Sequence, residues 1–111
     1  MNKENVYVSR LNTILTEVKT NINQYNNLYS EYLAEQSNNC PNYNCIKKLK
    51  SMEQINSHLN TITTEAQHIV NNLSSINNNY KINYSNDSIK LDNVYKKVKS
   101  QKRIINKLKN V

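Results

Sequence analysis

The chain has 111 residues, which is enough for a single domain, and a formal net charge of +7 at pH 7. It contains no glycine, which excludes the glycine-rich phosphate loops of nucleotide-binding enzymes and the nucleophile elbow of hydrolases. It has no apolar run of about 18 residues, so we expect no membrane-spanning helix. Its first residues lack the apolar core of a secretory signal, so we expect synthesis in the cytosol.

The first predicted helix spans residues 5–36. Its apolar residues follow one another at alternating steps of three and four, the heptad spacing of a helix that packs along one side. They are Val8, Leu11, Leu15, Val18, Ile22, Tyr25, Tyr29 and Tyr32. A run of turn-forming residues then predicts a loop over residues 37–44.

The second predicted helix spans residues 45–80 and the third spans residues 88–109. The second repeats the same spacing, through Met52, Ile55, Leu59, Ile62, Ala66, Ile69, Leu73, Ile76 and Tyr80. Asp87 or Ser88 is suited to cap the start of the third helix. The apolar side of that helix carries Leu91, Val94, Val98, Ile105 and Leu108, and Gln101 interrupts it.

These patterns predict an all-α protein with coiled-coil-like heptad seams, either an antiparallel helical hairpin or a three-helix bundle. The short loop after the first helix favours an antiparallel arrangement of the first two helices. The third helix either folds back onto this hairpin or continues the second helix after a kink, and the pattern leaves both open.

Several apolar residues lie off the main seams, so we expect a wider apolar face than one neighbouring helix covers. They are Ile14, Leu28, Leu33, Val70 and Ile104. A third helix, a second copy of the chain or another protein would cover this face, so the sequence predicts self-association or a protein partner.

The residues that carry chemistry are few, and they predict neither an enzyme nor a cofactor. Cys40 and Cys45 lie five residues apart and His58 and His68 ten apart, which is not the spacing of a zinc site, so we predict no metal. The two cysteines either form a disulfide across the loop, contributing about 2 kcal/mol, or stay free thiols. The adjacent Ser57 and His58 point about 100° apart on a helix and form no catalytic dyad.

Tyr25, Tyr29 and Tyr32 lie on one side of the first helix. They either fill the core, with their hydroxyl groups reaching the surface, or form a face that binds a partner. Tyrosine suits the second role because it offers a large contact area, few rotatable bonds and a polar tip.

The positive charge is concentrated in residues 81–111, which carry nine basic and two acidic side chains. Lys96, Lys99, Arg103 and Lys107 fall within about 80° of one another on a helical wheel, opposite the apolar side. This stripe is either a solvated lysine face or a contact for nucleic acid, an acidic protein surface or anionic lipid. Either acidic side chains of the first helix neutralise it (Glu17, Glu31, Glu35) or an external anion does. Nucleic-acid binding would be non-specific, because aromatic residues are not interleaved with the basic ones.

The segment over residues 22–33, INQYNNLYSEYL, repeats tyrosine at helical spacing and is followed by a loop containing asparagine and cysteine. In this it resembles small helical virion proteins of large DNA viruses. The resemblance implies a minor structural or packaged component of a virion that is made in the cytoplasm of a host cell. It assigns no role to any single residue.

Three functions therefore compete. The leading hypothesis is a helical structural or protein-interaction subunit, acting through packed apolar seams. The second is a non-specific nucleic-acid-binding protein that uses the basic third helix. The third is a small viral or phage effector that inhibits a host protein.

Overall fold

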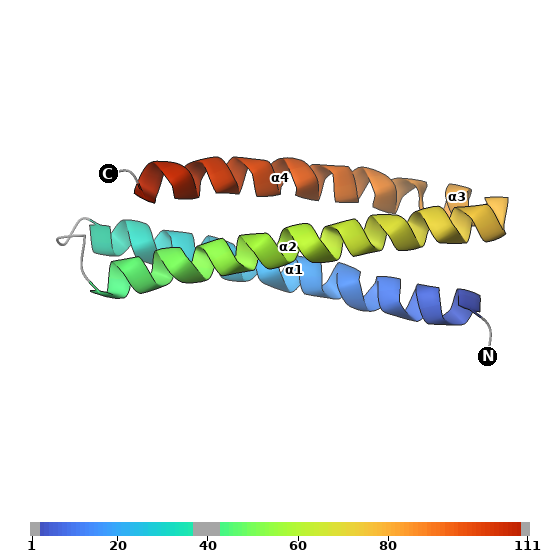
Figure 1. Ribbon diagram of the computed structural model, residues 1–111, viewed down its shortest axis with the longest axis horizontal. Helices are drawn as coiled ribbons and strands as arrows, with labels where there is room; N and C mark the ends of the chain where they lie inside the picture. The colour runs from blue at the N-terminus through green and yellow to red at the C-terminus, as the bar shows by residue number, and fades with distance from the viewer. Residues whose placement is uncertain (1–2, 37–42, 110–111) are drawn as a thin grey trace.

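The computed structural model describes residues 3–36 and 43–109, and 98% of this part is helical. Four helices follow one another: α1 (Lys3–Gln36), α2 (Tyr43–Ile76), α3 (Asn78–Asn83) and α4 (Ser85–Lys109). They form an elongated body of 55 × 24 × 16 Å (Figure 1). No strand occurs in the described ranges, and the all-α prediction is confirmed.

Helices α1 and α2 form an antiparallel hairpin. Their side-chain contacts pair later residues of α1 with earlier residues of α2, as an antiparallel register requires. From one end to the other they are Arg10–Glu65 at 2.8 Å, Glu17–His58 at 3.7 Å and Glu31–Lys48 at 3.8 Å. The predicted hairpin is therefore confirmed.

Helix α4 folds back along α2, which decides between the two arrangements that the sequence left open. Contacts of Tyr95 with Thr64, of Val98 with Asn56 and of Lys109 with Glu53 run in antiparallel order. Among the described residues no Cα atom of α1 lies within 8 Å of one in α4. Helix α2 is thus the central element, and α1 and α4 both pack on it (Figure 1).

The predicted second helix ends four residues too late, because α2 stops at Ile76. Asn77 is extended, with φ −151° and ψ 121°, and its side chain accepts a hydrogen bond from the Asn79 amide at 3.0 Å. Asparagine competes with helical hydrogen bonding in this way, and it caps the short helix α3 here. The apolar spacing extends past this break and could not reveal it.

The other boundaries also differ from the sequence prediction. Helix α4 begins at Ser85, three residues before the predicted start at 88, and α2 begins at Tyr43, inside the predicted loop. The remainder of that loop, residues 37–42, lies outside the described residues.

The core lies mainly where α1 meets α2, and most of the predicted seam residues are buried in it. Leu11, Leu59 and Leu73 are fully buried, whereas Ile76, the last residue of α2, is 48% exposed. Ile14 is fully buried although it lies off the predicted seam. Val70, also off the seam, joins a hydrophobic cluster with residues of α1 and α4. Helices of the same chain therefore cover part of the wider apolar face, because Ile14 and Val70 are buried, Leu28 and Ile104 are half-buried, and Leu33 stays exposed.

Candidate functional site

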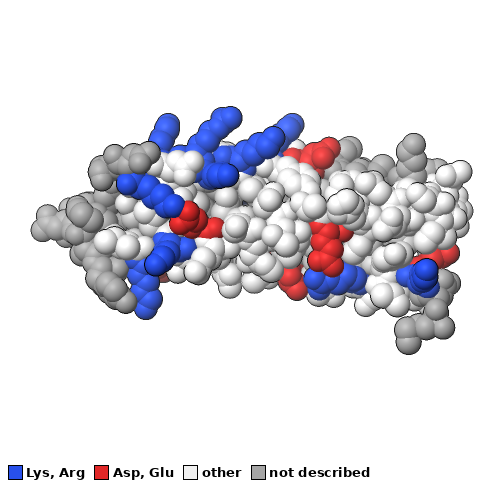
Figure 2. Space-filling model, viewed as in Figure 1, with Lys and Arg blue, Asp and Glu red and all other residues white. Residues whose placement is uncertain are grey.

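Helix α4 is rotated so that its basic side chains face solvent. Leu91, Val98 and Ile105 recur every seven residues, and each is at least nine-tenths buried in the core. Because these residues fix one side of α4 against the bundle, the opposite side projects outward. The exposed surface of α4 carries six cations, here called the basic face: Lys96, Lys97, Lys99, Lys102, Arg103 and Lys107. Figure 2 shows basic side chains gathered along α4.

The basic face has no internal counter-charge. The sequence contains no acidic residue between positions 93 and 109, and within the described part of the chain none of the six cations makes a salt bridge. By contrast, Lys109 of α4, which is not part of the basic face, forms a salt bridge with Glu53 of α2. Arg103 also lies four residues from both Lys99 and Lys107, and such like-charged pairs each disfavour a helix by a few tenths of a kcal/mol.

Two of the three acidic side chains of the first helix that could neutralise this face pair elsewhere. Glu17 contacts His58 and Glu31 contacts Lys48, both on α2. The side chain of Glu35 lies outside the described residues. Since α2 is the neighbour of α1 along its length, the carboxylates of α1 reach cations of α2 instead of α4. Among the described residues, Glu17 and Glu31 therefore do not neutralise the basic face, and an external anion stays a prediction.

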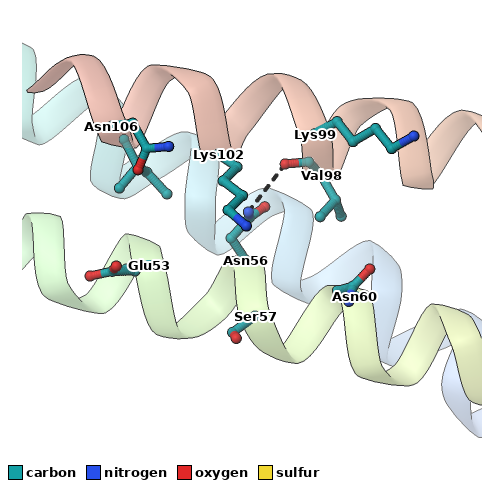
Figure 3. A pocket seen from close by; sticks show the side chains of 9 residues that line it. Glu53, Asn56, Ser57, Asn60, Val98, Lys99, Lys102 and Asn106 are labelled. Atoms are coloured by element: carbon teal, nitrogen blue, oxygen red, sulfur yellow. Dashed lines mark hydrogen bonds between the residues drawn. The ribbon is translucent and has the colours of Figure 1, made fainter.

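A groove of about 400 Å³ runs beside the basic face, between α2 and α4 (Figure 3). We call it the α2–α4 groove. Its exposed or half-buried lining is polar, and Asn56, Val98 and Ile105 form its buried lining. The polar residues are Glu53, Ser57 and Asn60 from α2, and Lys99, Lys102 and Asn106 from α4.

Among the described residues of α2 and α4, three polar side chains are buried, and one of them, Asn56, lines this groove. Asn56, Thr63 and Gln101 are each at most 5% exposed. The Asn56 Nδ2 group donates to the carbonyl of Val98 at 3.2 Å. The Asn56 Oδ1, the Thr63 hydroxyl and both amide atoms of Gln101 have no hydrogen-bond partner among the described residues. A buried polar group without a partner costs about 1–3 kcal/mol, so these residues lower the stability of the fold.

Replacing Gln101 with Leu is therefore expected to stabilise the protein, by about 1–3 kcal/mol, because an unpaired buried amide becomes an apolar side chain of similar size. Chemical denaturation of the variant and the parent measures the difference. Replacing the exposed Lys102 with Leu in the same helix serves as the control and should change stability little. A loss of stability in the Gln101 variant would show that the amide is satisfied in solution.

Sequence reasoning singled out Gln101 only as an interruption and missed Asn56 and Thr63. A signal was present, because Leu49, Asn56, Thr63 and Val70 recur every seven residues beside the main seam of α2. This second line of residues indicates that a second helix packs on α2. The pattern was missed because two of its members, Asn56 and Thr63, are polar.

The tyrosines of α1 belong mainly to the core. Tyr25 is 2% and Tyr32 6% exposed, and both pack with Met52 and Ile105 in one cluster. Burial raises the pKa of Tyr25 to about 12, with a smaller contribution from the nearby Tyr29. Tyr29 is partly buried against the same cluster. Tyr25 and Tyr32 therefore lie in the core, but the Tyr25 hydroxyl is buried without a hydrogen-bond partner among the described residues, whereas the core interpretation expected it to reach the surface. The partner-binding face stays a prediction.

The remaining predicted groups do not assemble into a reactive centre in the described part of the chain. Cys45 is 1% exposed and is not a free thiol, while Cys40 lies outside the described residues, so the disulfide between them stays a prediction. No three side chains of the described residues that could bind a metal lie together. None of the helices, over the residues described, is both long enough and apolar enough to cross a membrane.

Comparison of the chain with known proteins found no significant match to a protein-family model, to a curated protein or to a solved structure.

Proposed function

We propose that the protein is a non-catalytic helical interaction subunit that holds nucleic acid on the basic face of α4. The observation that supports this proposal most directly is the set of six exposed cations without a counter-charge among the described residues. Isolated surface lysines are common, but a row of them on one helix creates a positive potential that attracts a polyanion. The row from Lys96 to Lys107 is about 16 Å long at 1.5 Å per residue, enough for roughly three or four phosphates.

The surroundings of the basic face favour nucleic acid over a lipid surface. A helix that binds a membrane interface inserts its apolar side, whereas the apolar side of α4 is buried in the bundle. Tyr95 is the aromatic residue nearest to the row in sequence, and its hydroxyl donates to Thr64 at 2.9 Å. With no free aromatic residue in the row, we expect contacts to the phosphate backbone and no reading of base sequence.

A second candidate is a structural subunit that self-associates through the ends of the rod. Val6 and Ile76 are 52% and 48% exposed, and the nearby hydrogen bond from Tyr80 to Glu4 places the start of α1 beside α3. At the opposite end, Leu33 and Ile46 are 46% and 57% exposed. Apolar residues at both ends favour end-to-end packing of copies. Under either candidate function the protein would be a packaged virion component, as its resemblance to small helical virion proteins implies. The host-inhibitor hypothesis stays a prediction.

The proposed function is tested by measuring how salt changes the affinity for labelled nucleic acid of several unrelated sequences. We expect the logarithm of the binding constant to fall with the logarithm of salt concentration, with a slope of about −3 to −4 for duplex DNA, because three or four phosphates release counterions. The affinity should be similar for all sequences. Absence of binding at low salt would contradict the proposal. If polyglutamate displaced the nucleic acid at equal charge concentration, an acidic protein would be the better partner.

A further inference from the structure

The α2–α4 groove adjoins the basic face, and its size suits a small chemical group. A volume of about 400 Å³ lies in the usual range of ligand sites, 300–1,000 Å³. Lys99 belongs both to the groove and to the row of cations from Lys96 to Lys107. In Figure 3 the Lys102 side chain extends from α4 toward Asn56 of α2. A chain of phosphates bound on the basic face would therefore pass the mouth of this groove.

The charge of the groove favours a phosphate. Lys99 and Lys102 line it and form no ion pair among the described residues. Its single carboxylate, Glu53, is already paired with Lys109. Two free ammonium groups beside the hydroxyl of Ser57 and the amides of Asn60 and Asn106 provide the donors that phosphate oxygens accept.

Asn56 adds a requirement that phosphate alone does not meet. The carbonyl of Val98 can only accept a hydrogen bond, so the Nδ2 group must face it, and this leaves Oδ1 as the acceptor. Oδ1 is buried in a residue that lines the groove, and no donor reaches it in the part of the chain that the structure describes. A ligand that satisfies it must carry a donor such as a hydroxyl close to its phosphate. The backbone of RNA has this donor in the 2′-hydroxyl, and the backbone of DNA does not.

We infer that the α2–α4 groove is a ribose-phosphate site through which the protein binds RNA more tightly than DNA. This inference rests on the proposed function, because the strand is first held by the basic face. The phosphate lies between Lys99 and Lys102. The Lys102 side chain turns toward this phosphate. The 2′-hydroxyl of the neighbouring ribose then donates a hydrogen bond to Asn56 Oδ1.

The test compares single-stranded RNA and DNA of the same sequence by fluorescence anisotropy, with the full chain and its variants. The parent is expected to bind RNA about five- to tenfold more tightly, the effect of about one hydrogen bond. Asn56→Leu should lower the RNA affinity to that of DNA and leave DNA binding unchanged. Lys102→Gln should weaken binding of both strands.

Thr63→Val is the matched control, because it also removes an unpaired buried polar group from the same side of α2, but outside the groove. It should keep the preference for RNA, and circular dichroism of both variants checks that they fold. Equal affinity of the parent for RNA and DNA, or an unchanged preference in Asn56→Leu, would overturn the ribose-phosphate site while the proposed function stands. Binding to neither strand would overturn both.

A second arm titrates AMP and dAMP into the parent and follows the amide resonances. We expect weak, ribose-dependent shifts at α2 and α4, and much tighter binding of the oligonucleotide. If AMP bound as tightly as the RNA strand, the groove would belong to a free ribonucleotide, and the inference that a strand occupies it would be overturned.

Discussion

Replacing Lys96, Lys99, Arg103 and Lys107 together with Gln is expected to lower the affinity for nucleic acid about a hundredfold or more at low salt. Each cation that neutralises a phosphate contributes about one unit to the salt slope, so the slope should fall toward zero. The four side chains are exposed and make no ion pair in the described structure, so helicity should be retained. Anisotropy titrations at several salt concentrations, with circular dichroism of the same samples, measure both effects.

The control for this variant carries the same loss of charge elsewhere. Lys19, Lys47, Lys50 and Lys90 are exposed and lie outside the basic face, and replacing them with Gln also removes four positive charges. This variant should keep most of the affinity, because charges away from the contact act only through a screened field. If the two variants lost affinity equally, net charge alone would explain the binding. If neither lost any, the basic face would be only a solvated surface.

The fold could be predicted from the sequence because its main signal is repetitive. The heptad spacing of α1 and α2 extends over many turns, and helices of this length depend mainly on burial of one side. The end of α2 could not be read in the same way. It depends on the local competition of the Asn77 side chain for a backbone amide, and the apolar residues Ile76 and Tyr80 conceal it by continuing the spacing.

The candidate site could be predicted only in part, because it combines residues of two helices. The stripe of four cations follows from one helical wheel, and the structure places all four on the exposed side of α4. Lys102 and Asn56 were not singled out, because they lie on different helices. They line one groove only because α4 folds back along α2, the arrangement that the sequence left open. Burial of polar groups such as Gln101 also contradicts the usual pattern of apolar core residues.

Replacing Leu59 with Ala is expected to destabilise the protein by about 2–4 kcal/mol, the usual range for a fully buried leucine. Leu59 has no exposed surface and lies in the cluster where α2 packs with residues of α1 and α4. Leu15, on the predicted seam of α1, is only partly buried, so Leu15→Ala should cost less. Chemical denaturation, followed by circular dichroism, gives the free energy of unfolding of each variant.

The comparison that decides what stabilises the fold is between this core and the loop. Replacing Cys40 and Cys45 with Ser removes any bond between them, and closing so short a loop contributes at most about 2 kcal/mol. We therefore expect the double serine variant to lose less stability than Leu59→Ala. A reversed order would mean that the loop, and not the packing of α1 and α4 on α2, holds the helices together. The predicted order follows from burial, because Leu59 is surrounded by apolar neighbours whose contacts relax only partly into the space that alanine leaves.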